Sequence, residues 1–249
     1  MLATRVLCWF ALPVSALAQQ SPGDWPIHST DRPRPPIVSP GRGALPVPAP
    51  ADAKVLFDGK DLSRWQDEKG GPARWRLVGG LAFEVAPGTG TLFTRDSFGD
   101  MQLHLEWASP DPPRGQDQDR GNSGVFLMGR YEVQVLDSYK NITYADGQAA
   151  AVYGQYPPLV NASRPPGKWQ SYDMVWRRPR FEEGGRLLSP ARLTLFHNGV
   201  LVQENVVLTG PTGHHVRPPY EMHPDRLPIG LQDHGHRVRY RNIWVRTLE

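Results

Sequence analysis

The sequence predicts an all-β protein built as a two-sheet jelly-roll sandwich, and three observations lead to this fold class. The 249 residues include 25 glycines and 26 prolines, which favours short elements joined by turns. Apolar runs of four to nine residues recur between turn signals along most of the chain. No window keeps an apolar period of 3.6 residues over a dozen residues, so long amphipathic helices are not expected.

The first 18 residues have the features of an export signal. Arg5 supplies one positive charge, the apolar stretch Val6–Leu17 follows, and Ala16-Leu17-Ala18 matches a cleavage site. We expect residues 1–18 to be a Sec-type signal peptide, too short for a transmembrane segment, and the protein to be periplasmic or secreted. The single cysteine, Cys8, lies within it, so the mature chain has no disulfide.

Residues 19–53 are rich in proline, with Pro33, Pro35 and Pro36 among many others. Such a segment lacks the apolar surface that would offset the entropy lost on ordering. We therefore expect residues 19–53 to be a flexible tether without a core of its own.

The folded domain is expected over residues 54–249, as a series of short strands. The runs predicted to form them are Trp75–Val78, Leu81–Val85, Met101–Trp107, Gly124–Met128, Tyr131–Leu136, Tyr172–Trp176, Leu193–Phe196, Leu201–Val207 and Val238–Val245. Gly79-Gly80 and His197-Asn198-Gly199 separate paired runs and predict tight hairpins. Many short strands at this turn density are typical of a sandwich or jelly roll.

Charge and motifs exclude several function classes. The formal net charge is only +3 and no Lys/Arg block is present, so nucleic acid is not an expected partner. The chain has no Gly-x-Ser-x-Gly motif, no P-loop and no dinucleotide fingerprint after a strand. Serine hydrolase, NTPase and Rossmann functions are therefore not predicted.

The stretch from Arg120 to Asp137 is the most informative part of the sequence. Alternation along a strand would turn Tyr131, Val133 and Val135 toward the core. Glu132 and Gln134 would then share the opposite face, which predicts a solvated groove there. An acid beside an amide suits sugar hydroxyls, which both donate and accept hydrogen bonds. The structural alternative is that Glu132 only neutralises a neighbouring arginine.

The C-terminal region repeats this pattern. Gln232 and His234 share one face of a run, and Arg239 and Arg241 share one face of the next. A histidine is a general base near neutral pH, and an arginine stabilises an oxyanion. The structural alternative for His234 is a hydrogen bond at a strand end.

Metal ligands are not predicted from the remaining polar clusters. His214, His215 and His223 lie in a proline-rich loop without a catalytic zinc motif, so we expect surface residues. The acidic loop Asp111–Asp119 lacks the ligand order of a calcium loop and is expected to be solvated.

The domain resembles the bacterial DUF1080 family, described as 3-keto-disaccharide hydrolases or 3-keto-glucoside lyases/hydratases. The matching pieces, in the family's order, are residues 56–65 (LFDGKDLSRW), 121–126 (GNSGVF), 131–137 (YEVQVLD), 197–199 (HNG), 228–235 (PIGLQDHG) and 241–243 (RNI). The resemblance implies a concanavalin A-like jelly roll with its site on a concave sheet. It also implies an exported enzyme that acts on glycosides oxidised at C3.

The ketone at C3 acidifies the C2 proton, which opens an elimination route to glycosidic cleavage. We expect Glu132 and His234 to act as base and acid in either order, with Arg120 or Arg241 directed at the enolate oxygen. The expected substrate-binding residues are Gln134, Gln232, Asn122, Tyr153, Trp169 and Asp137. No cofactor is predicted, although a divalent metal on the enolate would be chemically favourable.

Two alternative functions fit the same residues. Glu132 and Asp137 resemble the acidic motif of retaining glucanases, but they point to opposite faces of a regular strand. A non-catalytic sugar-binding module needs only a groove with amides and aromatic rings. Convergence of Glu132, His234 and an arginine on one cavity would favour the enzyme.

Overall fold

The computed structural model describes residues 18–41, 43 and 45–248, and their regular structure is almost entirely β. Two one-turn 3-10 helices, Pro22–Asp24 and Ala145–Gly147, are the only helices in this part of the chain. The strands are β1 (Lys54–Phe57), β2 (Trp65–Gln66), β3 (Arg76–Val78), β4 (Ala82–Glu84), β5 (Leu92–Phe98), β6 (Met101–Ala108), β7 (Ser123–Leu127), β8 (Tyr131–Val135), β9 (Gln170–Arg177), β10 (Arg180–Phe181), β11 (Leu187–Ser189), β12 (Arg192–His197), β13 (Val200–Val207), β14 (Leu227–Leu231) and β15 (Arg239–Thr247).

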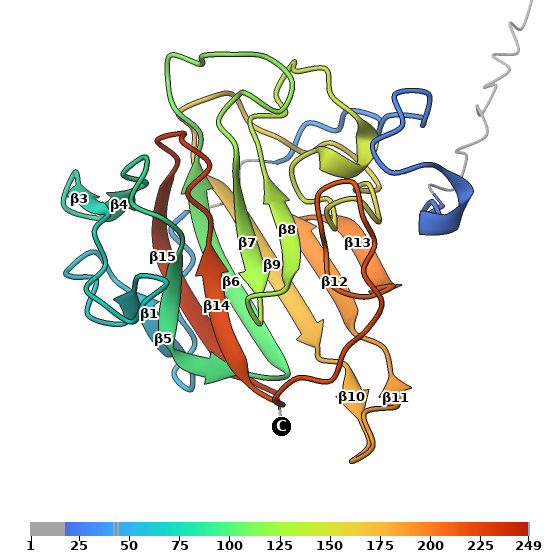
Figure 1. Ribbon diagram of the computed structural model, residues 1–249. Coiled ribbons are helices and arrows are strands. Elements are labelled where there is room, and N and C mark those ends of the chain that lie inside the picture. The colour runs from blue at the N-terminus through green and yellow to red at the C-terminus, as the bar shows by residue number, and fades with distance from the viewer. Residues whose placement is uncertain (1–17, 42, 44, 249) are drawn as a thin grey trace, which may run out of the picture.

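The strands form two antiparallel sheets packed face to face as a jelly-roll sandwich, which confirms the predicted fold class (Figure 1). The larger sheet has the order β13-β12-β9-β6-β15-β4-β3, with β1 paired to β15. The smaller sheet has the order β2-β5-β14-β7-β8. The hairpin β10–β11 projects from one end of the sandwich.

Both predicted tight hairpins are present, and their residues adopt the required backbone conformation. Gly79 and Gly80 connect β3 to β4 with φ of 59° and 71°. Asn198 and Gly199 connect β12 to β13 with φ of 54° and 78°. Two consecutive residues at positive φ match the right-handed twist of the flanking strands, which is why asparagine and glycine occupy these turns.

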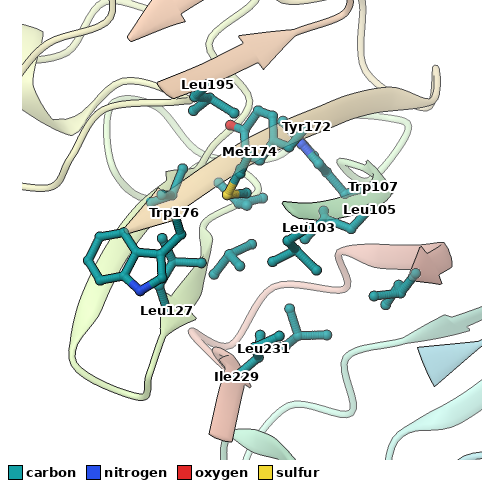
Figure 2. Packing of buried hydrophobic residues seen from close by; sticks show 14 of the residues in the cluster. Leu103, Leu105, Trp107, Leu127, Tyr172, Met174, Trp176, Leu195, Ile229 and Leu231 are labelled. Atoms are coloured by element: carbon teal, nitrogen blue, oxygen red, sulfur yellow. The ribbon is translucent and has the colours of Figure 1, made fainter. Parts of the chain in front are cut away.

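The core lies between the sheets and follows the alternation of the strands (Figure 2). Leu103, Leu105 and Trp107 of β6 meet Leu127 of β7 and Leu231 of β14 in this layer. All five side chains are buried. The neighbours between them on β6, including His104 and Glu106, therefore point to the outer face of the larger sheet.

The proline-rich segment differs from the free tether that the sequence predicts. It contains no strand, yet it lies beside the loop that follows β8 (Figure 1). His28 and Arg32 are buried against Asp146, at 3.3 and 3.6 Å from its carboxylate oxygens. Further along, the Val47 amide donates to Glu106 and the Val47 carbonyl accepts from Asn242. Buried charges on the domain need partners, and this segment supplies them.

The expected signal peptide lies almost wholly outside the described residues. In the part of the chain that is described, no helix has both the length and the apolar character needed to cross a membrane.

Candidate active site

Strand β8 presents Glu132 and Gln134 on the outer face of the smaller sheet, as the alternation predicts. Tyr131, Val133 and Val135 belong to the hydrophobic core, and the Tyr131 ring packs 5.0 Å from that of Trp176. Glu132 and Gln134 instead line a cavity of about 550 Å³. A strand with its core on one side and polar groups on the other therefore forms the floor of this cavity, called the cleft below.

The cleft brings together six of the ten site residues expected from the sequence. Glu132, Gln134, His234, Gln232, Asn122 and Tyr153 all line it. Its remaining lining residues are Gln118, Phe126, Tyr144, Thr212, Gly213 and His214. These side chains come from β7, β8 and four loops, so the cleft exists only in the folded domain.

Glu132 is a buried acid. Its side chain packs over Gly124 on the adjacent strand, where a Cβ atom would lie 3.1 Å from Glu132 Cδ and closer still to Oε1. No hydrogen bond or ion pair from a described residue reaches its carboxyl group, so the arginine partner of the structural alternative is not found. Burial raises the pKa of Glu132 to about 8. The neutral acid is therefore the favoured form at pH 7.

The amides of the cleft form a connected row. Gln134 Nε2 donates to Gln118 Oε1 over 3.0 Å, and Asn122 Nδ2 donates to the Gln118 carbonyl over 2.9 Å. Asn122 Oδ1 and Gln232 Oε1 are buried and have no partner among the described residues. Unpaired buried acceptors are costly, so these two oxygens are suited to receive hydroxyl donors from a ligand.

Two tyrosines close another side of the cleft. The hydroxyl groups of Tyr144 and Tyr153 lie 2.9 Å apart, and the Tyr153 amide donates to the Glu132 carbonyl. Burial raises the pKa of both phenols, so both remain neutral hydrogen-bond donors throughout the physiological range.

His234 lies in the cleft as an exposed side chain. Its ring stacks with that of His236 at a centroid distance of 6.0 Å. The ring makes no hydrogen bond with a described residue. The structural alternative, in which His234 makes a hydrogen bond at a strand end, is therefore not what the structure shows. His234 is thus a solvent-accessible base that shares one cavity with the buried acid Glu132.

Arg120 and Asp137 do not reach the cleft. Arg120 Nε donates to Asp137 Oδ2 over 2.7 Å, and this pair lines a second cavity of about 320 Å³. Asp137 is buried, which raises its pKa against the opposing effect of Arg120. Arg120 is therefore used to neutralise a buried acid, which corrects its expected role at an enolate oxygen.

Arg241 and Trp169 lie on the outer face of the larger sheet, and their expected roles are also corrected. Arg241 Nε donates to Glu106 Oε2 over 2.7 Å, and its guanidinium stacks 4.1 Å from the Trp169 ring centroid. Next to Arg241, Tyr240 points inward and donates to Ser123 of the smaller sheet. Alternation along β15 therefore turns Arg241 away from the sheet that forms the cleft.

Several cleft residues were not predicted as functional. Gln118 was assigned only to an acidic solvated loop, although it donates to Thr143 and accepts from Gln134. Tyr144 and Thr212 are loop residues without a motif, and no sequence signal distinguishes them. His223 was expected on the surface but is buried, with its Nε2 2.9 Å from the Tyr131 hydroxyl. In the described residues the acidic loop forms no group of metal-ligating side chains.

Comparison with known proteins places the domain in a family. Residues 52–246 match the family described as the 3-keto-alpha-glucoside-1,2-lyase-like domain. No curated protein matches the chain significantly.

Solved structures from Parabacteroides distasonis ATCC 8503 have the same fold. One, described as a candidate glycosyl hydrolase, is 44% identical, with 87% of this chain and 93% of that chain covered and a TM-score of 0.79. A second with the same description is 19% identical over 80% of this chain and 94% of that chain, with a TM-score of 0.56. The second likeness concerns the fold alone.

Proposed function

Because the chain belongs to the family of 3-keto-alpha-glucoside-1,2-lyase-like domains, we propose that it cleaves glycosides oxidised at C3 by elimination followed by hydration. The candidate glycosyl hydrolase that is 44% identical supports a glycoside as substrate. The observation that carries the proposal is the pairing, in one cleft, of a buried and unpaired acid with an accessible imidazole. From the export signal, we further propose that the reaction takes place in the bacterial envelope.

The cleft supplies each group that the elimination needs. His234 removes the proton at C2, and the electron pair forms the C1–C2 double bond as the bond from C1 to the leaving oxygen breaks. Glu132, neutral because it is buried, gives its proton to that oxygen. The alcohol leaves, and an enone remains in which the C1–C2 double bond is conjugated with the C3 ketone.

Neutral donors take the place expected for arginine. Negative charge develops on O3 in the transition state. The Tyr144 and Tyr153 hydroxyls share one hydrogen bond, which leaves one O–H of the pair free to donate to O3. Asn122 Oδ1 and Gln232 Oε1 accept from the remaining sugar hydroxyls. Water then adds its hydroxyl to C1 and gives its proton to the Glu132 carboxylate, while protonated His234 returns a proton to C2. This gives the free 3-keto sugar and restores both side chains.

The geometry speaks against the glucanase alternative. A retaining pair requires carboxyl groups about 5–5.5 Å apart across one substrate. Glu132 and Asp137 line different cavities, and Asp137 is paired with Arg120. Glu132 and His234 both line the cleft, as the enzyme interpretation requires, but no arginine lines it.

The proposal is tested with matched glucosides, with and without the C3 ketone, in D₂O. We expect cleavage of the 3-keto glucoside with deuterium incorporated at C2, beyond that of free product incubated without enzyme. Elimination breaks the C2–H bond, whereas displacement at C1 leaves it intact. Cleavage of the plain glucoside without C2 label would overturn the proposal in favour of direct hydrolysis. Binding of both without cleavage would instead identify a sugar-binding module.

A further inference from the structure

Three histidines from distant parts of the sequence meet at the edge of the cleft. His28 comes from the proline-rich segment, and His214 and His215 come from the loop between β13 and β14. One ring nitrogen from each lies within 4.8 Å of the other two. The rings of His214 and His215 are 4.0 Å apart, and that of His28 is 5.0 Å from His215.

His28 has the environment of an oriented ligand. It is buried, and its Nδ1 lies 3.3 Å from Asp146 Oδ1, while its backbone amide donates to Asp146 Oδ2. Its Nε2 is buried and has no partner among the described residues. A carboxylate on one ring nitrogen fixes the tautomer that leaves the other nitrogen free to bind a metal.

The other two histidines occupy a tight turn that holds them side by side. Gly213 and Val216 form an antiparallel bridge, so His214 and His215 are its two central residues. His215 has a φ of 57°, a conformation that usually favours glycine or asparagine. The turn holds the two imidazole rings on the same short loop, and glycine at position 215 would make the same turn.

We propose that His28, His214 and His215 form a binding site for one divalent transition-metal ion, with Asp146 orienting His28. Imidazole nitrogens suit zinc and its neighbours in the first transition series. Bonds of about 2.0–2.1 Å to one zinc ion place two nitrogens about 3.4 Å apart. Rotation of the two exposed side chains closes the remaining gap. Three protein ligands leave at least one coordination position open, and His214 also lines the cleft.

The site has two consequences for the protein. An ion there would join the N-terminal segment to the loop before β14, although the two are nearly two hundred residues apart. It would also put a Lewis acid beside the sugar-binding cleft. Cleavage after Ala18 would leave His28 in the mature chain. The proposal does not depend on the proposed reaction, and its test needs no substrate.

The test is titration of the untagged, chelator-treated protein with Co²⁺, followed by visible absorption. We expect d–d bands that saturate at one equivalent and are abolished by Zn²⁺. His214→Ala and His215→Ala, which change exposed residues, should each weaken Co²⁺ binding at least ten-fold. The matched control is His236→Ala, because His236 contacts Asp119 and lines the other cavity. Absence of saturable Co²⁺ binding to the wild type would overturn the proposal, as would unchanged affinity in both variants.

A second variant separates metal binding from folding. His215→Gly keeps the turn and relieves its positive φ, so the metal-free variant should unfold at or above the wild-type temperature. Zn²⁺ should raise the unfolding temperature of the wild type and of His236→Ala, but not that of His215→Gly. An equal rise in all three proteins would mean that the ion binds elsewhere and that the assignment is wrong.

Discussion

At the scale of single residues, Glu132 is the group on which the proposed chemistry depends most. It is a carboxyl group with a pKa raised to about 8 by burial alone, and its neighbours are amides, a phenylalanine and two tyrosines. An ordinary solvated carboxyl could not donate a proton at neutral pH. Burial of the Glu132 side chain over Gly124 therefore keeps the acid protonated before any substrate binds.

Burial of Glu132 has a pH-dependent cost for stability. Between the unfolded pKa of 4.5 and the folded value of about 8, the folded state binds more protons than the unfolded state. The contribution of Glu132 to the free energy of unfolding therefore falls as pH rises through this window and is level below it. We expect Glu132→Gln to remove this fall, making the variant more stable than the wild type by about 2–4 kcal/mol at pH 9 and nearly equal at pH 4.

Urea denaturation of both proteins at a series of pH values measures this difference. The same variant should lose turnover, because an amide cannot give up a proton, and wild-type activity should decline as pH rises through about 8. Parallel stability curves for the two proteins would show that Glu132 is not buried as a neutral acid.

We expect activity to require glycine at position 124, because the Glu132 side chain lies directly over it. A Cβ at this position would press on the Glu132 side chain, so Gly124→Ala should displace the carboxyl and lower kcat/KM about 10- to 100-fold. The matched control is Gly184→Ala, since a Cβ at Gly184 meets nothing within 4 Å. Steady-state kinetics on a 3-keto glucoside measure both. Wild-type activity in Gly124→Ala would mean that the position of Glu132 does not matter.

At the scale of elements, the proline-rich segment acts as part of the domain. It forms no strand because proline cannot donate to a β-ladder, yet it carries charged residues to the loop after β8. Arg32 donates to the Gln155 carbonyl and lies 3.6 Å from Asp146. Composition correctly predicts that the segment has no strand, although Pro22–Asp24 forms one turn of 3-10 helix. The contacts of the segment with the domain depend on single side chains, which composition does not predict.

Asp146 is expected to hold this segment in place. Asp146→Asn leaves the buried Arg32 without its carboxylate, which should cost about 2–4 kcal/mol and release the segment. Limited proteolysis should then cut the variant near residue 32 faster than the wild type. Asp31→Asn, which changes an exposed acid one residue from Arg32, is the control and should be cut at the wild-type rate. Equal protection in Asp146→Asn would show that other contacts hold the segment.

At the scale of the whole molecule, a few buried hydrogen bonds register one sheet against the other. The Tyr240 hydroxyl on β15 donates to Ser123 Oγ on β7, and Ser123 Oγ donates to the Gln232 carbonyl. The Tyr172 hydroxyl on β9 donates to the Gln134 carbonyl on β8. The two bonds from the larger sheet end on Gln134, which lines the cleft, and on Ser123, which is next to the cleft residue Asn122. The larger sheet therefore supports the site from behind.

Tyr240→Phe should destabilise the protein by about 1–2 kcal/mol, because a buried hydrogen bond between the sheets is lost while the ring stays. Tyr139→Phe is the control, since the Tyr139 side chain is only half-buried. Thermal unfolding of the two variants and the wild type gives the comparison. A loss in Tyr139→Phe as large as that in Tyr240→Phe would argue against a specific role for the inter-sheet bond.

The sequence by itself determined nine of the fifteen strands in the described residues, both hairpins, the family and the face on which Glu132 and Gln134 lie. Alternation, turn chemistry and motif order are local properties, so they can be read along the chain. Gln232 and His234 were predicted on one face of a strand and do line the cleft, but β14 ends at Leu231 and both lie in the loop that follows it.

Only the tertiary structure decided which charges pair and which histidines meet. Arg241 and Glu106 are 135 residues apart, and His28 and Asp146 are 118 apart. A buried charge is stable only beside an opposite one, and packing of distant elements selects that partner. Arg120 and Arg241 therefore pair with the buried carboxylates of Asp137 and Glu106. His28, which the sequence analysis assigned to a flexible tether, lies beside His214 and His215.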